Sequence, residues 1–342
     1  MTQFVKAYRR LGAVENAPPV NYNPPVANTR ISAQLVLAVA FMPLLAGAAC
    51  EKKKPNDTGA ISAMDRAGSG STGSSGGSST VAAGPADTTP MKGIDVGKLD
   101  GEKQKLFYQL VASLKSPCGK SHSLRTSYEQ DTACKRAPFA VKYVASLIED
   151  EVKEADVRDF YTNKYEKEPQ HVKIDTSKAV RIGKPDAPVR LVEFFDYECP
   201  HCQLFAPTME KVEEKMGGKV VVYYMMFPIE SKHPDARSAA MAAYAANAQG
   251  KFHEMHLTLF EKSPQHGKDA VLGFAKQLGL DGAKFEADYA AADAQVTADL
   301  KAGEGAGVDS TPTLFFNDRR YEGPMNPEYI GMWIDEEIAV NR

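Results

Sequence analysis

The part of the sequence best suited to chemistry is a pair of cysteines separated by two residues, in the segment Cys199-Pro200-His201-Cys202. Two thiols at this spacing can form a small disulfide and exchange it with other thiols, although half of a zinc site uses the same spacing. The sequence has no second cysteine pair at this spacing and no histidine pair separated by three residues. Redox chemistry is therefore favoured, and no metal site is predicted.

The elements that flank the motif explain how it can be activated. An apolar run over 189–195 predicts a buried strand before it, and a helix-like stretch over 203–216 follows it. Cys199 is then expected at the N-terminus of a helix, where unpaired N–H groups and the helix dipole favour an anion. This position lowers the pKa of the thiol, and the thiolate is the reactive form. Pro200 suits the first helical position, which needs no N–H partner.

The second cysteine and the intervening histidine complete the predicted site. Cys202 lies nearly one turn beyond Cys199 on the same helical face, so that it can close a ring with Cys199. His201, if it is protonated or donates a hydrogen bond, is expected to stabilise the Cys199 thiolate further. The motif therefore predicts a reactive sulfur at Cys199 and a deeper sulfur at Cys202.

A second segment, about a hundred residues downstream, covers 307–317 and reads GVDSTPTLFFN. Together with the C-P-H-C motif, it resembles the thioredoxin superfamily, and specifically its DsbA-like branch of thiol:disulfide oxidoreductases. The resemblance implies that Thr311-Pro312 is a cis-proline loop, which lies beside the cysteines and holds an extended client backbone. An ordinary trans proline that opens an edge strand is the alternative.

The same resemblance implies a role for Glu193, which stands in the apolar strand six residues before Cys199. Relatives have a buried acidic residue there that assists proton transfer to the inner cysteine. The alternative is a carboxylate that points to solvent or pairs with a lysine, since burial of a charge is costly. Asp196 and Glu198, which flank the motif, are expected to be surface charges, and His256 is expected on a helix surface.

In the family, a C-P-H-C site makes a strongly oxidising disulfide, because the reduced form is unusually stable. The resemblance therefore implies an enzyme that donates disulfides to client proteins with free thiols. It also implies reoxidation by a separate membrane redox partner, and no cofactor beyond the Cys199–Cys202 disulfide. Many oxidative members have valine before the cis-proline, so Thr311 leaves open a reductase or an isomerase. A module of another class, which binds metal through its thiols or holds clients without turnover, is a further alternative.

The N-terminal segment predicts export. An apolar run over 31–49 follows Arg30, ends in LLAGAA and leads directly to Cys50 and a charged EKKK segment. This resembles a bacterial lipoprotein signal, in which the cysteine becomes lipidated and N-terminal; a plain cleaved secretory signal and an uncleaved membrane anchor are the alternatives. The expected location is the bacterial cell envelope, on the periplasmic side, with a lipid anchor at Cys50.

Composition divides the chain into four parts. We expect a leader over 1–50, a flexible Gly/Ser-rich tether over 51–98, a small mainly helical module over 99–168 and a DsbA-like domain over 174–342. The last part should contain a helical insertion at about 231–300. The predicted fold class is therefore α/β, a thioredoxin-like fold with an inserted helical lid, preceded by the helical module. Strands are predicted at 180–182, 189–195, 219–227, 313–317 and 320–323.

The remaining cysteines fit an oxidising compartment. Cys118 and Cys134 are expected to form a structural disulfide, which closes a loop of about 15 residues and contributes about 3 kcal/mol. The functional alternative is a second redox relay that exchanges with Cys199 and Cys202. A net charge of −3, without a basic patch interleaved with aromatic residues, predicts no nucleic-acid partner.

Overall fold

The computed structural model describes residues 87–167 and 171–341. The predicted leader, its lipidation at Cys50 and the tether up to residue 86 lie outside the described residues. Within the described ranges, no helix combines the length and the apolar character that a bilayer crossing requires.

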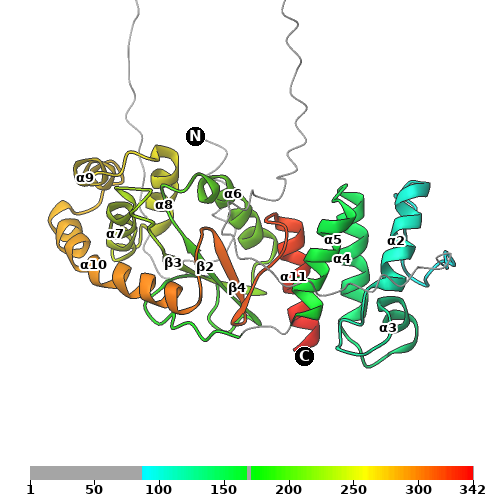
Figure 1. The fold of residues 1–342 in the computed structure, drawn as a ribbon. Helices are drawn as coiled ribbons and strands as arrows, with labels where there is room; N and C mark the ends of the chain where they lie inside the picture. Colours follow the sequence, from blue (N-terminus) through cyan, green and yellow to red (C-terminus); the bar gives the residue numbers. More distant parts are fainter. Residues whose placement is uncertain (1–86, 168–170, 342) are drawn as a thin grey trace, which may run out of the picture. The chain divides into compact units, whose positions relative to one another are not determined.

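A five-stranded mixed sheet organises the C-terminal part of the chain, with the order β1-β3-β2-β4-β5. Figure 1 labels its central strands β3, β2 and β4. The strand β2 runs parallel to β3 and antiparallel to β4, so that it lies at the centre of the sheet. Its nearly continuous apolar sequence is typical of a strand that is covered on both faces. The strands are β1 Val180–Ile182, β2 Val189–Phe195, β3 Val220–Met226, β4 Thr313–Phe316 and β5 Arg319–Arg320.

Successive side chains of β2 point to opposite faces of the sheet, and each face carries its own apolar core. Leu191 and Phe195 contribute to the larger core, and Val192 and Phe194 contribute to a smaller core on the opposite face. By the same alternation, Glu193 shares the face of Leu191 and Phe195. The charged side chain therefore stands on the face that carries the larger core.

Six helices accompany the sheet. The crossover helix α6 Pro200–Lys215 connects the parallel strands β2 and β3, and α11 Pro327–Val340 closes the chain against α6 and β2. Four helices are inserted between β3 and β4 and gather together in Figure 1. They are α7 Ala236–Asn247, α8 Phe252–Lys262, α9 Lys268–Gln277 and α10 Gly282–Gly305. Because α10 continues to Gly305, the helical insertion extends a few residues beyond its predicted end at about residue 300.

The N-terminal module consists of four helices, of which α5 continues into a short π-helical turn. Side-chain caps begin two of them: Asp100 accepts a hydrogen bond from the N–H of Lys103, and Ser123 accepts one from the N–H of Thr126. The helices are α2 Gly101–Ser113, α3 Leu124–Gln130, α4 Ala137–Glu149 and α5 Glu154–Tyr161, with the turn Thr162–Glu166. This module, with the mixed sheet and its inserted helices, agrees with the predicted fold class.

The module and the sheet domain meet at α11. Tyr329 of α11 is part of the apolar core of the module, whereas Ile330 and Ile334 of the same helix belong to the larger core of the sheet domain. The Tyr329 hydroxyl also donates a hydrogen bond of 2.8 Å to Asp150, at the end of α4. One helix thus contributes apolar side chains to both cores.

A buried ionic cluster lies at the same junction and is centred on Glu336 of α11. Its carboxylate oxygens lie 2.9 Å from Lys164 Nζ and 2.8 Å from Arg136 Nη1, and one accepts a hydrogen bond of 2.8 Å from the Tyr165 hydroxyl. Burial lowers the pKa of Lys164 to about 8, although the negative charge of Glu336 opposes this shift. Burial alone would raise the pKa of Glu336, but the charges of Lys164 and Arg136 hold it below its ordinary value. Both members of the Lys164–Glu336 pair are therefore ionised at neutral pH.

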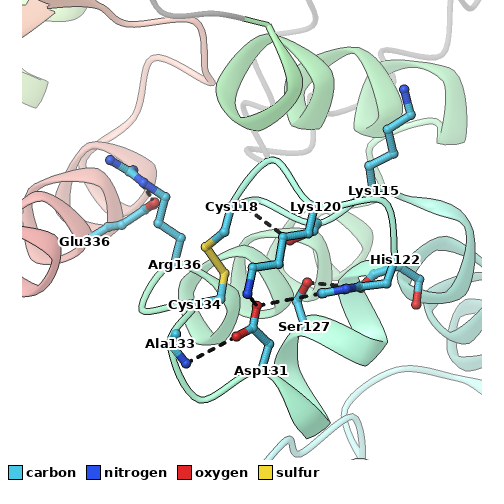
Figure 2. The surroundings of a disulfide bond; sticks show 12 residues. Lys115, Cys118, Lys120, His122, Ser127, Asp131, Ala133, Cys134, Arg136 and Glu336 are labelled. Atoms are coloured by element: carbon cyan, nitrogen blue, oxygen red, sulfur yellow. Dashed lines mark hydrogen bonds and ion pairs between the residues drawn. A yellow bond between two sulfur atoms is a disulfide. The ribbon is translucent and has the colours of Figure 1, made fainter.

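A disulfide between Cys118 and Cys134 joins two loops of the module, at a sequence separation of 16 (Figure 2). Cys134 is buried and Cys118 is exposed. Figure 2 shows Arg136, two residues after Cys134, extending to Glu336. The disulfide therefore restrains the segment that presents Arg136 to the ionic cluster.

Replacing Cys118 and Cys134 together by serine is expected to lower the free energy of unfolding by about 3 kcal/mol, because a crosslink over a loop of this length restricts the unfolded chain. Urea denaturation of the double variant and of the parent protein measures the difference. An unchanged midpoint would contradict a structural role. A double variant that keeps its stability but loses thiol exchange at Cys199 would favour the relay instead.

Candidate active site

The two cysteines of the C-P-H-C motif lie at the junction between β2 and α6. Cys199 is the N-cap of α6, and Pro200 occupies the first turn of this helix. Both cysteines are reduced, without a disulfide between them, and their exposed fractions are 6% for Cys199 and 1% for Cys202. The structure therefore places the outer cysteine at the helix start and the inner cysteine beneath it.

Several donors favour the thiolate of Cys199. The pKa of Cys199 is lowered to about 5. The largest cause of this shift is a hydrogen bond from the Cys202 thiol, and burial opposes it. The Thr311 side chain and the backbone N–H groups of Cys202 and His201 contribute further. These are the unpaired N–H groups that a helix N-terminus offers to an anion. Cys199 is therefore ionised at neutral pH.

The inner cysteine has the opposite character. Burial, followed by the hydrogen bond and charge of Cys199, raises the pKa of Cys202 well above its ordinary value. The backbone N–H of Asp196 donates a hydrogen bond of 3.5 Å to Cys202 Sγ. The two sulfurs thus form an asymmetric pair, with a stable thiolate at Cys199 and a neutral thiol at Cys202.

The His201 side chain is exposed. His201 acts on Cys199 through its backbone N–H, which is one of the groups that lower the pKa of the Cys199 thiol. The predicted stabilisation of the thiolate by the imidazole ring stays a prediction.

The loop that contains Thr311 and Pro312 lies beside Cys199. The peptide bond between Thr311 and Pro312 is cis, and the Cys199 thiol donates a hydrogen bond of 3.4 Å to the backbone oxygen of Thr311. The Thr311 hydroxyl is buried and has no hydrogen-bond partner among the residues that the structure describes. It nevertheless favours the ionised Cys199, towards which the hydroxyl can donate. Two segments that are far apart in the sequence thus meet at one sulfur.

Glu193 is buried, with an exposed fraction of 4%. Its Oε2 atom has no hydrogen-bond partner within the described part of the chain. Burial, and then the charge of Glu213, raises the pKa of Glu193 to about 8. Burial likewise raises the pKa of Glu213 to about 7, although a hydrogen bond from Tyr224 opposes this effect. Glu193 therefore carries a proton at neutral pH.

The expectation that Asp196 and Glu198 are surface charges is wrong. Their exposed fractions are 2% and 7%, and each carboxylate faces a histidine. Asp196 Oδ2 lies 2.7 Å from His233 Nδ1, and Glu198 Oε1 lies 3.3 Å from His266 Nδ1. Both histidines belong to the segment inserted between β3 and β4. Burial becomes tolerable because His233 and backbone N–H groups form hydrogen bonds with the carboxylates. Local sequence cannot show partners that lie so far along the chain.

The expectation that His256 lies on a helix surface is also wrong. Its ring is buried among aromatic side chains that include Phe195 and Phe260, and its Nδ1 atom lies 3.0 Å from the Tyr197 hydroxyl. Burial, and then the charge of His253, lowers the pKa of His256 to about 3. The helical periodicity of α8 is the signal that could have revealed this, because His256 lies one position after Met255 and one turn after Phe252, both of them buried.

Within residues 87–167 and 171–341, no group of three or more histidine, cysteine, aspartate or glutamate side chains has an arrangement that could hold a metal ion.

Comparison with known proteins places the chain among related sequences. Residues 175–336 match the thioredoxin family model. The chain is 36% identical over 146 residues to the Na(+)/H(+) antiporter NhaA 1 of Mycobacterium sp. (strain KMS), which covers 42% of this chain and 24% of the antiporter. It is 36% identical over 176 residues to the antiporter NhaA 3 of Salinispora tropica, which covers 50% of this chain and 26% of that protein. The chain thus spans about a quarter of the length of these curated relatives.

Solved structures are similar to about half of the chain. BdbD from Bacillus subtilis, in its oxidised state, has 23% sequence identity and a TM-score of 0.45, and the match covers 50% of this chain and 99% of BdbD. A thioredoxin-like oxidoreductase from Silicibacter pomeroyi has 28% identity and a TM-score of 0.42, with 46% and 90% of the two chains covered. The thiol-disulfide exchange protein α-DsbA2 from Wolbachia pipientis has 20% identity and a TM-score of 0.42, with 46% and 86% covered.

Proposed function

We propose, from the premise that residues 175–336 form a thioredoxin domain, that the protein is an extracytoplasmic thiol:disulfide oxidoreductase which donates disulfides to client proteins. The observation that carries the proposal is the asymmetry of the cysteine pair. The pKa of Cys199 is lowered to about 5, whereas the pKa of Cys202 is raised well above its ordinary value. A pair of this kind favours its reduced state and therefore gives up a disulfide readily.

The reaction proceeds by two thiol–disulfide exchanges. A client thiolate attacks Cys199 Sγ of the oxidised pair; a sulfur–sulfur bond forms between client and Cys199, the bond to Cys202 breaks, and the electron pair leaves on Cys202 Sγ, which takes up a proton. A second client thiolate then attacks the client sulfur of this mixed disulfide and expels Cys199 as a thiolate. The client dithiol has been oxidised to a disulfide, and Cys199 and Cys202 have been reduced. A low pKa makes Cys199 a good leaving group in the second step.

The surrounding residues have distinct roles in this scheme. The buried, protonated Glu193 supplies or accepts the proton of Cys202, because its pKa of about 8 lies near the working pH. Thr311 and Pro312 seat the client backbone beside Cys199. Reoxidation of the pair transfers two electrons to a separate redox protein of the membrane, and the Cys199–Cys202 disulfide is the only redox group the reaction requires.

We place the domain in the bacterial cell envelope, on the periplasmic side, with a lipid on Cys50. The support for this location is the apolar run over 31–49 that ends in small residues before Cys50. Mass spectrometry of the mature N-terminus decides the point, since a mature chain without diacylglycerol on Cys50 contradicts the anchor.

The experiment that tests the proposed function is the reduction potential of the Cys199–Cys202 pair, measured in glutathione buffers. We expect a value well above about −270 mV, the potential of thioredoxin, and nearer the value of about −120 mV of a strong oxidant. Alkylation of the reduced protein should accelerate with a midpoint near pH 5. A potential near that of thioredoxin contradicts disulfide donation.

The same thiolate makes the stability of the reduced protein depend on pH. Because the pKa of Cys199 is lower in the folded state, at about 5, than its unfolded value of about 8.5, ionisation stabilises the reduced protein at high pH. This stabilisation is complete above about pH 8.5 and is lost as the pH falls to about 5. Buried groups such as Glu193 titrate in both redox states, so the measurement is the difference between them. The stability of the reduced protein relative to the oxidised protein, measured by denaturation at pH 5 and pH 8, should be lower at pH 5.

A reductase or isomerase with the same site is the second candidate function. The observation that favours it is threonine, rather than valine, before the cis-proline. Catalysed reduction of insulin disulfides at the potential of thioredoxin would support this candidate. A module that binds metal without turnover would instead retain metal after purification.

A further inference from the structure

The backbone of Asp196 contacts both cysteines of the pair. Its N–H donates a hydrogen bond of 3.5 Å to Cys202 Sγ, and its carbonyl oxygen accepts one of 3.2 Å from the N–H of Cys199. Asp196 follows the last residue of β2 and lies three residues before Cys199, the N-cap of α6. The positions of these two peptide groups relative to the sulfurs therefore depend on how the short segment between strand and helix is held.

The Asp196 side chain holds this segment from within the protein. Its carboxylate is completely buried. Oδ1 accepts a hydrogen bond of 2.8 Å from the N–H of Glu198, and Oδ2 accepts one of 2.8 Å from the N–H of Ile229. Oδ2 also lies 2.7 Å from His233 Nδ1. A carboxylate can only accept, so the proton between them belongs to Nδ1 of His233.

A second carboxylate ties the same segment to the inserted helices. Glu198 Oε2 accepts a hydrogen bond of 3.2 Å from the N–H of Asp235, and Oε1 lies 3.3 Å from Nδ1 of the fully buried His266. His266 Nε2 in turn donates a hydrogen bond of 2.8 Å to the backbone oxygen of Leu259. Both carboxylates of the segment are therefore anchored in the chain between β3 and β4.

We infer that the backbone N–H of Asp196 is a catalytic group that stabilises negative charge on Cys202 Sγ, and that the Asp196 carboxylate and His233 position it. The inference rests on the proposed function. Charge develops on this sulfur in both directions of the reaction: Cys202 leaves as a thiolate when a client thiolate attacks Cys199, and it attacks as a thiolate when the pair closes again. A fixed donor aimed at an atom where charge develops favours the transition state, because it needs no reorganisation. Burial of Cys202 excludes water as a substitute donor.

The reaction of the reduced protein with an aromatic disulfide separates the two sulfurs. In the first, bimolecular phase, the Cys199 thiolate attacks the probe and releases one coloured aromatic thiolate. In the second, unimolecular phase, the Cys202 thiolate attacks Cys199 Sγ, closes the protein disulfide and releases a second coloured thiolate. Because Cys199 is then held in a mixed disulfide, it does not titrate, and the pH profile of the second phase reports Cys202. The Asp196 N–H and the Thr311 side chain act on this sulfur, and Glu193 is its proposed proton partner. Glu193 is the same in every variant, so a midpoint that differs between variants reports the hydrogen bond to Cys202.

Asp196→Asn is expected to slow the second phase about threefold at pH 7 and to raise its midpoint by about one pH unit. An amide nitrogen cannot accept, so one of the N–H groups around position 196 loses its partner. A weakened hydrogen bond to a charged group raises the pKa of Cys202 by about one unit. At pH 7 this means about tenfold less Cys202 thiolate, but a thiolate of higher pKa is a better nucleophile, so the rate falls only about threefold. His233→Leu, which leaves Asp196 in place, should act in the same direction. His233→Gln, which keeps a donor, should restore most of the rate.

The first phase is the internal control and should change by less than about twofold in each variant, since the donors to Cys199 remain. The matched control is Asp293→Asn, which removes the charge from an exposed aspartate in an ion pair with Arg237. Equal slowing of both phases, or no change in the second, overturns the inference; if Asp196→Asn does not fold, His233→Leu carries the same comparison. A parent protein whose first phase is no faster than that of free cysteine at mildly acid pH instead contradicts the proposed function.

Discussion

Replacing Cys199 by serine is expected to abolish disulfide donation and reduce client oxidation to the uncatalysed rate. A serine hydroxyl neither forms a disulfide nor leaves as a stable anion, whereas the pKa of the Cys199 thiol is lowered to about 5. The measurement is oxidative refolding of a reduced client protein in a glutathione buffer. Any catalysed rate that remains in Cys199→Ser would contradict the assignment of the reacting sulfur.

The companion variant Cys202→Ser tests the other half of the pair. It keeps the reactive Cys199 thiolate but removes the sulfur that closes the ring, so that reaction with a client disulfide should stop at the mixed disulfide with Cys199. This complex should be stable on a non-reducing gel and should dissociate on addition of reductant. The matched control is the double serine variant at Cys118 and Cys134, in which exchange at Cys199 should be unchanged.

The largest expected effect on stability comes from the ionic cluster on α11. Glu336→Leu is expected to lower the free energy of unfolding by about 3–5 kcal/mol, because the buried Lys164 loses its partner and must either keep an unpaired charge or give up its proton. Lys164 has an exposed fraction of 3%, so that water cannot replace the carboxylate. Urea denaturation of the oxidised protein measures this loss.

A second substitution separates the loss of the pair from the loss of side-chain packing. Glu336→Leu combined with Lys164→Met removes both charges, and the double variant should recover most of the stability, since an apolar pair often replaces a buried ion pair without cost. The control on the same helix is Asp335→Asn, whose ion pair with Lys219 is about half exposed, and it should change stability by less than about 1 kcal/mol. A double variant as unstable as Glu336→Leu would show that the charge of Lys164 is not the cause.

The strands that position the site could be predicted from the sequence because their signals are local. Apolar runs bounded by turn residues mark β2, β3 and β4, and the observed bounds differ from the predicted ones by one residue or less. The short helix α3 could be predicted only as part of a mainly helical module, because seven residues are too few for a clear periodicity. The returning strand β5 was predicted at 320–323, but it covers only Arg319–Arg320, where two pairs with β4 define it.

The candidate site was predictable only as far as its contacts are local. Cys199 and Cys202 share one helical turn, and the approach of Thr311 to Cys199 followed from the family resemblance. Asp196 differs, since its environment depends on His233 and Ile229, which belong to a segment that begins after another strand. A carboxylate next to a reactive motif looks the same in sequence whether it is solvated or buried.

The division of α11 between two cores determines what a shortened chain can reveal. A protein that began at residue 171 would still contain every residue of the sheet, but it would expose the Tyr329 ring and would leave Glu336 facing solvent without Lys164 or Arg136. If such a fragment precipitated, the cause would be the exposed surface of α11 and not the loss of a catalytic residue. Point substitutions on the outer surfaces of α2 and α3 are therefore the cleaner way to ask whether the first four helices recognise a client.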